Sequence, residues 1–421
     1  MTITICCLLC LLIGADDDTY FDLSPDHPAN RLHRALFTRH QDGQVIGLDS
    51  LDPLIWPNSI HLLDDERLNR VLGALDAVSS TDLPISVRSR AILQNDLWAI
   101  FDGIAQGLGT GGPGQAERDE ARETLMRRLV VTMRAIALDD HEIESLDSNL
   151  AAAIRSEAWP SRAIGRSGPF LPADLLEDGG RWRAVSQPGR MAAHIHNNSI
   201  GARSTFFVLL AVPEEQGGTA ALIERLDARG LTAPSEKGHR LRTDLPGVPT
   251  GTQAALVRRL AVVNRNGERR TTRIVSSVQI REFVDESPQH QPPAARFDET
   301  QRLAEFRLSR ARLLREETGG LAPLGPEDRR YTLIFHHGID ELGMQAPIEL
   351  RTCRMCHAQE GVASLVSLIG LATGPGQIDQ FEFSEPPLAP GLGTRNAELA
   401  KVDAVLRESR RWERLRELWD E

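Results

Sequence analysis

Cysteine is scarce in this chain of 421 residues, which contains five copies. Three of them, Cys6, Cys7 and Cys10, lie in an apolar run at the N-terminus. The other two, Cys353 and Cys356, are separated by two residues and followed directly by His357. If the N-terminal run is cleaved off, the mature protein keeps two thiols, and both lie in this one short motif.

The sequence also lacks an excess of basic residues, and its formal net charge is −11. The arginines are interspersed with aspartate and glutamate rather than clustered. Binding to phosphates requires a basic surface. We therefore expect no nucleic acid partner.

The N-terminal apolar run, from Ile3 to Ile13, is too short to span a bilayer. Residues 1–15 are typical of a secretory signal peptide, with Ala15 before the cleavage point. No lysine or arginine precedes the run, and Ile13 is bulkier than usual at its position, so a misplaced start codon or a buried strand is the alternative. We expect an exported protein, periplasmic or extracellular, with no integral membrane span after removal of the signal.

Several catalytic signatures are missing. The sequence contains no Gly-x-Ser-x-Gly elbow, no His-Glu-x-x-His and no dinucleotide fingerprint. The glycine-rich run Gly107–Gly114 follows a helical pattern rather than a strand, and no Gly-Lys-Ser/Thr closes it, so we interpret it as a linker. Whether the protein is an enzyme stays undecided.

The composition, 41% hydrophobic and 25% charged, is that of a soluble globular protein, and the length suggests two or three domains. We expect an α+β fold. The expected segments are an irregular leader (16–61), a helical domain (62–160), a mixed, largely antiparallel α+β domain (180–345), a motif segment (346–373), a Pro/Gly-rich linker (374–395) and a C-terminal helix (396–421).

Helical periodicity is clearest in four places. Leu68, Val71, Leu72 and Leu75 recur at helical spacing, and so do apolar residues over 92–104. Residues 115–138 form an amphipathic pattern, and 143–158 predict another helix that ends at Pro160, with Ser148 or Asn149 as the cap of a shorter segment.

Strand signals begin at Arg181. Runs rich in β-branched and aromatic residues predict strands over 192–197, 204–212, 254–264 and 270–284, with a helix over 220–229. The last two strands are joined by Asn264-Arg265-Asn266-Gly267, whose Asn-Gly pair suits a tight hairpin turn.

The strongest chemical signal is Cys353-Arg354-Met355-Cys356-His357. Two thiols at this spacing can both bond to the edge of one porphyrin, and the adjacent imidazole then lies under the iron as an axial ligand. These five residues, and no others in the chain, resemble the attachment signature of the c-type cytochromes. The resemblance implies one covalent haem c on Cys353 and Cys356, with His357 as the proximal ligand, attached outside the cytoplasmic membrane. The absence of a second such motif argues against two-haem peroxidases and multihaem carriers.

The chain departs from small soluble cytochromes c after the motif, where their second axial ligand is usually a methionine. Residues 358–421 contain neither methionine nor histidine. A methionine ligand would raise the potential, a histidine would lower it, and an open position would permit small-ligand or peroxide chemistry. A sixth ligand is therefore absent or comes from Lys401 or from upstream candidates, which are Met344, His336, His337, Met191, His194 and His196.

The pair His194 and His196 also suggests a separate metal site. On the expected strand, alternate side chains share a face and would present two nitrogens together. A third ligand is not evident at a familiar spacing, although Glu214 and Glu215 are candidates. Exposed surface histidines are the alternative.

We therefore expect an exported monohaem c-type protein active in electron transfer, with an unidentified redox partner or small-molecule donor. A structural zinc protein is the alternative, in which Cys353 and Cys356 bind zinc with two of His336, His337 and His357. A thiol redox pair and a plain secreted binding domain are further hypotheses.

Overall fold

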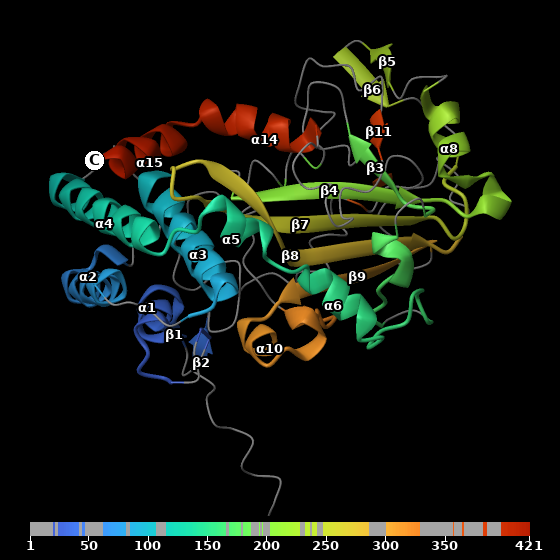
Figure 1. Cartoon of the computed structure of the whole chain (residues 1–421). Coiled ribbons are helices and arrows are strands. Elements are labelled where there is room, and N and C mark those ends of the chain that lie inside the picture. The colour runs from blue at the N-terminus through green and yellow to red at the C-terminus, as the bar shows by residue number, and fades with distance from the viewer. Residues whose placement is uncertain are drawn as a thin grey trace, which may run out of the picture.

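An antiparallel sheet of seven strands forms the centre of the protein, as Figure 1 shows for our computed structural model. The strands, in sheet order, are β10 (Leu321–Pro323), β9 (Gln301–Leu308), β8 (Arg269–Phe283), β7 (Gln253–Val263), β4 (Ser204–Ala211), β3 (Arg183–Ser186) and β11 (Glu382–Ser384). With helices around this sheet, the fold is α+β, as the sequence predicts.

The structure describes residues 20–21, 24–41, 44–46, 62–80, 85–106, 115–165, 168–177, 180–186, 193, 196, 203–227, 232–235, 238–241, 247–285, 300–328, 357, 364–365, 382–384 and 397–421. The expected signal peptide lies outside these residues.

The two faces of the sheet differ in character. Side chains alternate between faces along a strand, and residues paired across antiparallel strands share a face. Phe207, Val257, Val278 and Phe306 are paired in this way and belong to the main hydrophobic core, so we call theirs the apolar face. The opposite face, which we call the polar face, carries the buried side chains of Arg258, Gln279, Arg281, Gln301 and Glu305.

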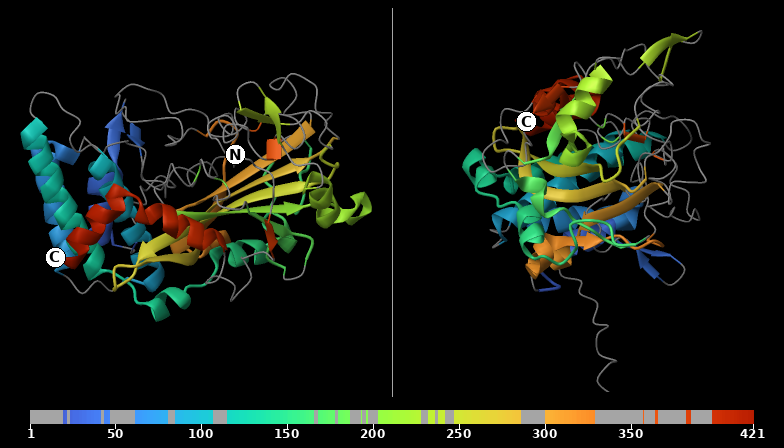
Figure 2. Two further views of the ribbon diagram at one scale, coloured as in Figure 1. Left: turned by 90° about the horizontal axis from the view of Figure 1, so that it is seen from above. Right: turned by 90° about the vertical axis from the view of Figure 1, so that its right-hand side faces the viewer.

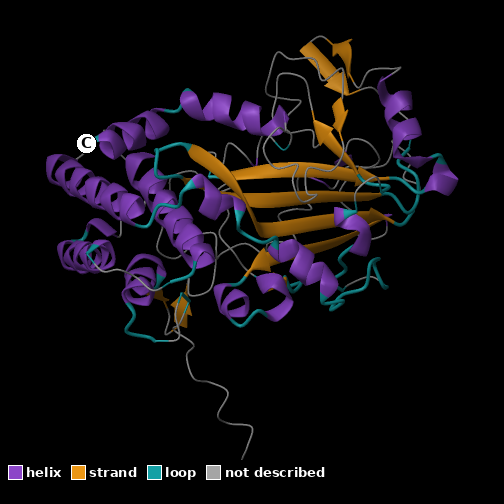
Figure 3. Ribbon diagram, viewed as in Figure 1, coloured by secondary structure: helices purple, strands orange, loops and turns teal. Residues whose placement is uncertain are grey.

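Most helices gather at one end of the sheet, and α8 (Gly218–Asp227) lies at the other end (Figure 3). The N-terminal group is α1 (Pro28–Phe37), α2 (Asp65–Ser79), α3 (Val87–Gln106) and α4 (Gln115–Ala135). The view from above in Figure 2 shows α15 (Arg410–Asp420) near α4 and α14 (Ala397–Arg407) running from there toward the sheet. Helices α1 to α4, α14, α15 and the apolar face share one continuous hydrophobic core.

The remaining elements are short. The helices α5 (Asp140–Glu144), α6 (Asn149–Arg155) and α10 (Arg310–Leu314) lie beside the sheet. Two small hairpins pair β1 (Arg39–Gln41) with β2 (Gln44–Ile46) and β5 (Thr232–Ser235) with β6 (Gly238–Leu241). Single 3-10 turns span η2 (Ala173–Leu176), η3 (Glu214–Gln216) and η4 (Glu317–Gly320).

Helix α3 joins the helical group to the sheet through buried polar side chains. The Gln94 side chain accepts from the Val263 backbone N–H at 2.8 Å and donates to the Val263 carbonyl at 2.7 Å. Asn95 donates to the Arg203 and Ala261 carbonyls at 2.9 and 2.8 Å. These bonds give the side chains of Gln94 and Asn95, which are 1% and 2% exposed, partners inside the protein.

Most of the predicted elements are present. The predicted strands over 204–212, 254–264 and 270–284 correspond to β4, β7 and β8, and the helix over 115–138 corresponds to α4. The segment expected to be an irregular leader also contains α1.

Two predicted helices are interrupted. The pattern over 143–158 resolves into α5, capped by Asp139, and α6, which begins at the predicted cap Ser148. The C-terminal helix divides at Ser409 into α14 and α15. No helix in the described part of the chain combines the length and apolar character that a bilayer crossing demands.

Candidate functional site

The polar face of the sheet buries charged and amide side chains that surfaces usually expose. Glu305 is 4% exposed and binds Arg307 at 2.6 Å, while Gln279 donates to Glu305 at 3.3 Å. Arg258 donates to the Ser204 hydroxyl at 2.8 Å, and its guanidinium lies over the Phe206 ring. Charged side chains are rarely buried unless they are paired, and here Glu305 and Arg258 both have partners. This concentration of buried polar groups makes the face the candidate site.

His357, the histidine of the Cys-x-x-Cys-His motif, is held on this face through Ser364. The Ser364 hydroxyl donates to the His357 carbonyl at 2.8 Å. Arg281 donates to the carbonyl and the hydroxyl of Ser364 at 2.9 and 2.7 Å, and Gln301 donates to the same hydroxyl at 3.0 Å. Residues 357 and 364 are therefore fixed to β8 and β9 by a buried polar network.

The hydrogen bond at the His357 ring defines its protonation. Nδ1 lies 3.0 Å from the Ser364 carbonyl oxygen. A carbonyl oxygen only accepts, so Nδ1 carries the proton and Nε2 of the neutral ring keeps its lone pair. Burial, with a further contribution from the positive charge of Arg281, lowers the pKa of His357 well below 6.5. The ring is therefore neutral at physiological pH, which is the form that binds metals.

His196 lies on the same face. Its ring centroid is 5.5 Å from that of Phe206 on β4. Burial lowers the pKa of His196 to about 4, with Glu305 opposing and Arg307, Arg258 and Arg281 adding to the shift. His196 is a further, smaller cause that lowers the pKa of His357.

The prediction of a strand through His194 and His196 is wrong at His196, which is helical. Pro188-Gly189 and Asn197-Asn198 flank the run, and these residues favour turns over strands. The alternation argument for a shared histidine face therefore does not apply. Glu214 and Glu215, the suggested third ligands, are exposed on η3. The described residues include no group of three or more metal-ligating side chains.

The other predicted site residues lie outside the part of the chain that the structure describes. They are Cys353, Cys356, Met344, His336, His337, Met191 and His194. Among the candidates that are described, the fold brings His357 and His196 onto one face. Sequence reasoning missed Arg281, Gln301 and Ser364. A signal for this face was present, because Gln279 and Arg281, like Glu305 and Arg307, recur at the two-residue spacing of one strand face.

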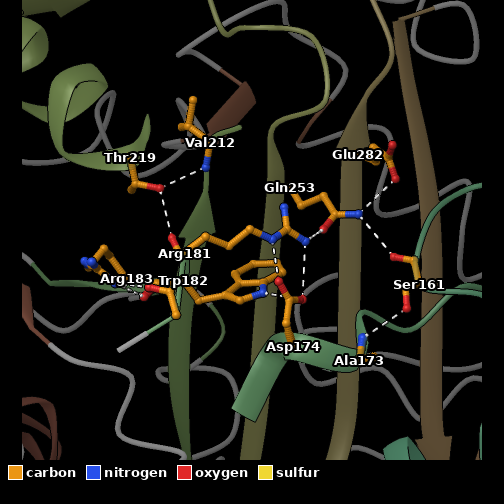
Figure 4. Close-up of polar contacts among 11 residues, drawn as sticks. Ser161, Ala173, Asp174, Arg181, Trp182, Arg183, Val212, Thr219, Gln253 and Glu282 are labelled. Atoms are coloured by element: carbon orange, nitrogen blue, oxygen red, sulfur yellow. Dashed lines mark hydrogen bonds and ion pairs between the residues drawn. The ribbon is translucent and has the colours of Figure 1, made fainter. Parts of the chain in front are cut away.

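A second polar network lies at the end of the sheet, between residues of the apolar face and the loop after α6 (Figure 4). Arg181 binds Asp174 at 2.5 Å and donates to Gln253 at 2.6 Å, and Gln253 donates to Glu282 at 2.9 Å. Although burial opposes it, hydrogen bonds from Arg181 and Trp182 lower the pKa of Asp174. The acidic groups of this network are bound by neighbouring donors, so it ties the loop to the sheet rather than offering a free nucleophile or base.

No protein-family model, curated protein or solved structure matches the chain.

Proposed function

We propose that this protein is an exported, single-haem electron carrier that resembles the c-type cytochromes at its attachment motif. Cys353 and Cys356 would form the two thioether bonds, and His357 would be the proximal ligand. The haem supplies one-electron redox chemistry when it is bound. The chain supplies the attachment, the ligand and the surrounding polarity.

The observation that carries the proposal is the hydrogen bond from His357 Nδ1 to the Ser364 carbonyl. Metal-ligating histidines almost always donate their second ring N–H to a carbonyl, a carboxylate or water, which fixes the tautomer and the ring orientation. His357 has this arrangement, and its Nε2 is left as the atom that would bind the iron. The motif histidine is therefore prepared for an axial role.

The arginines of the polar face would suit the propionates at the edge of a haem. Its propionates are carboxylates, and arginine is the side chain best suited to hydrogen-bond a carboxylate in a partly dry environment. Arg258 and Arg281 are 4% and 6% exposed on the polar face. Leu365, close to Ser364, packs with Phe283 and Leu210 and supplies an apolar surface beside these charges.

The test is a pyridine haemochrome assay on protein exported from a host with haem-attachment machinery. We expect a c-type spectrum that survives denaturation, an intact mass one haem above the mature chain, and loss of both in a Cys353→Ala/Cys356→Ala variant. A mature N-terminus following Ala15 is expected if residues 1–15 are a signal peptide. A colourless protein with the mass of the bare chain would overturn the proposal, and stoichiometric zinc in that sample would support the structural zinc alternative.

A further inference from the structure

Tyr20 and Phe21 belong to no helix or strand, and yet both side chains are buried against α1. The side-chain oxygen of Asn30 accepts from the backbone N–H groups of these two residues, at 2.8 and 2.9 Å. Asn30 is itself fully buried, and its amide nitrogen donates to the Ser24 carbonyl at 2.8 Å. A buried asparagine of α1 therefore holds the backbone of Tyr20 and Phe21, which we call the docked segment.

The docked segment covers the imidazole of His33. The centroid of this ring lies 4.5 Å from that of Tyr20 and 5.9 Å from that of Phe21, and Phe37 of α1 itself lies at 5.1 Å. His33 is 0% exposed, and neither ring nitrogen has a hydrogen-bond partner among the described residues. Buried polar atoms are normally paired. While the segment is docked, the imidazole is therefore kept from water as well as from polar groups of the protein.

The surroundings of His33 also oppose a positive charge. After burial, the positive charges of Arg310 on α10 and Arg34 on α1 are the causes that lower the pKa of His33. The Arg310 guanidinium lies 5.8 Å from the centroid of the Phe21 ring. Asp96 on α3 binds Arg310 at 2.5 Å, and the Tyr20 phenol is a further titratable group beside the ring. A proton on the enclosed His33 would thus gain neither water nor a hydrogen-bond acceptor.

We propose that the docked segment is released by acid, because a proton can be held on His33 only when Tyr20 and Phe21 leave Asn30 and admit water to the ring. The closed form keeps a neutral imidazole, and the open form binds the proton. Release is therefore linked to one proton, and the ratio of open to closed form rises with a slope that approaches tenfold per pH unit below about 6.5.

The docked segment is the part of the enclosure that can move at least cost. It lies outside the helices and strands, whereas Phe37 is fixed within α1. Local openings of this kind require less free energy than unfolding of the whole protein. Acidification would thus uncover Phe37 and the start of α1 while the rest of the fold stays closed. This inference does not depend on a haem.

Hydrogen exchange of the full chain, read at single residues by mass spectrometry at pH 7, 6 and 5, measures the release. Protection of the Tyr20 and Phe21 amides is corrected for the intrinsic exchange rate at each pH. For one proton and an open-form pKa of about 6.5, we expect this protection to fall about threefold from pH 7 to 6 and about eightfold from pH 6 to 5. The amide of Leu97, in the buried part of α3, should keep its protection.

Variants of His33 test whether this residue is the cause. In His33→Phe and in the smaller His33→Leu, no proton can be bound, so protection of the docked segment should not depend on pH. Asn30→Ala should lower the protection at every pH and keep the dependence. His141→Gln is the matched control, because His141 is an exposed histidine on α5, and it should follow the wild type.

Three results would overturn the proposal. The first is constant protection of Tyr20 and Phe21 in the wild type from pH 7 to 5. The second is the wild-type pH dependence in both His33→Phe and His33→Leu. The third is a parallel loss of protection at Leu97, which would show unfolding of the whole protein instead of release of the docked segment.

Discussion

At the scale of single residues, His33 shows how a polar side chain can be buried without a polar partner. It is fully buried on α1, between the rings of Tyr20, Phe21 and Phe37. Neither ring nitrogen has a hydrogen-bond partner among the described residues. Burial, followed by the positive charges of Arg310 and Arg34, lowers the pKa of His33 well below 6.5. The rings of Tyr20, Phe21 and Phe37 therefore surround a neutral, desolvated imidazole.

We predict that His33→Phe increases the free energy of unfolding at pH 7 by about 1 kcal/mol, because it removes two unsatisfied buried nitrogens. The gain should grow as the pH falls. Below pH 6.5, His33 binds a proton in the unfolded wild type but stays neutral in the folded wild type. His33 therefore lowers the free energy of unfolding of the wild type by up to about 1.4 kcal/mol for each pH unit below 6.5. The Phe variant lacks this contribution to the decline.

Urea denaturation at pH 7, 6 and 5 measures the effect. His141→Gln, at an exposed position on α5, is the control and should follow the wild type at each pH. A His33→Phe variant with the same stability difference from wild type at all three pH values would contradict the assignment of a neutral buried ring.

At the scale of elements, the hairpin between β7 and β8 is the clearest agreement between sequence and structure. Asn264-Arg265-Asn266-Gly267 forms the predicted turn, and the Asn264 side chain accepts from the backbone N–H groups of Asn266 and Glu268 at 3.1 and 2.9 Å. Gly267 has a φ of 73°. A Cβ at this residue would lie 2.8 Å from Trp419 Cδ1 on α15. The turn thus requires glycine for its backbone and for its contact with the C-terminal helix.

Gly267→Ala should lower the free energy of unfolding by about 1–2 kcal/mol, from the left-handed backbone alone, and by more if α15 shifts. The matched control is Gly73→Ala, within α2, where an added Cβ meets nothing within 4 Å. That control should gain up to about 1 kcal/mol from helix propensity. Thermal melts should show a lower melting temperature for Gly267→Ala and an unchanged or higher one for Gly73→Ala. A Gly267→Ala variant as stable as the wild type, or more stable, would contradict the contact with α15.

Prediction from sequence succeeded where one pattern of apolar residues, helical or extended, continued over many residues. The apolar residues of α4 and the long runs of β7 and β8 left little ambiguity. The cap predicted at Ser148 is confirmed at the start of α6. Prediction failed at Ser409, where the expected single C-terminal helix divides, and at His196, where turn-forming neighbours outweighed a short apolar run. Periodicity also could not show that α3 buries Gln94 and Asn95 against strand ends, because their partners lie more than 100 residues away.

For the candidate site, the sequence supplied the motif and its histidine but not their surroundings. Spacing alone identified Cys353, Cys356 and His357. It could not reveal that Arg281 and Gln301 anchor Ser364, because strand pairing brings these residues to one face from distant parts of the chain.

At the scale of the whole molecule, a buried ion pair joins α3 to α10. Arg310 and Asp96 have side chains that are 1% and 0% exposed, and they meet at 2.5 Å across 214 positions of sequence. Removing one member of such a pair leaves a buried charge without its partner, whereas replacing both by apolar residues removes that penalty.

Arg310→Met should therefore lower the free energy of unfolding by about 3–5 kcal/mol. The double variant Asp96→Leu/Arg310→Met should be more stable than this single variant. Arg70→Met, which breaks an exposed pair with Glu66 on α2, serves as the control and should change stability by less than about 1 kcal/mol. Chemical denaturation of the four proteins tests the set, and a double variant less stable than Arg310→Met would contradict the interpretation.

The bonds from α3 to the sheet also bear on the order in which the chain can fold as it is made. Gln94 bonds to Val263, which is synthesised 169 residues later. Asp96 pairs with Arg310, which is synthesised 214 residues later. Until β7 and α10 leave the ribosome, Gln94 lacks its partner Val263 and Asp96 lacks its partner Arg310. A nascent chain of this kind completes its core late. If the chain is exported as we propose, such a delay would keep it unfolded while it crosses the membrane.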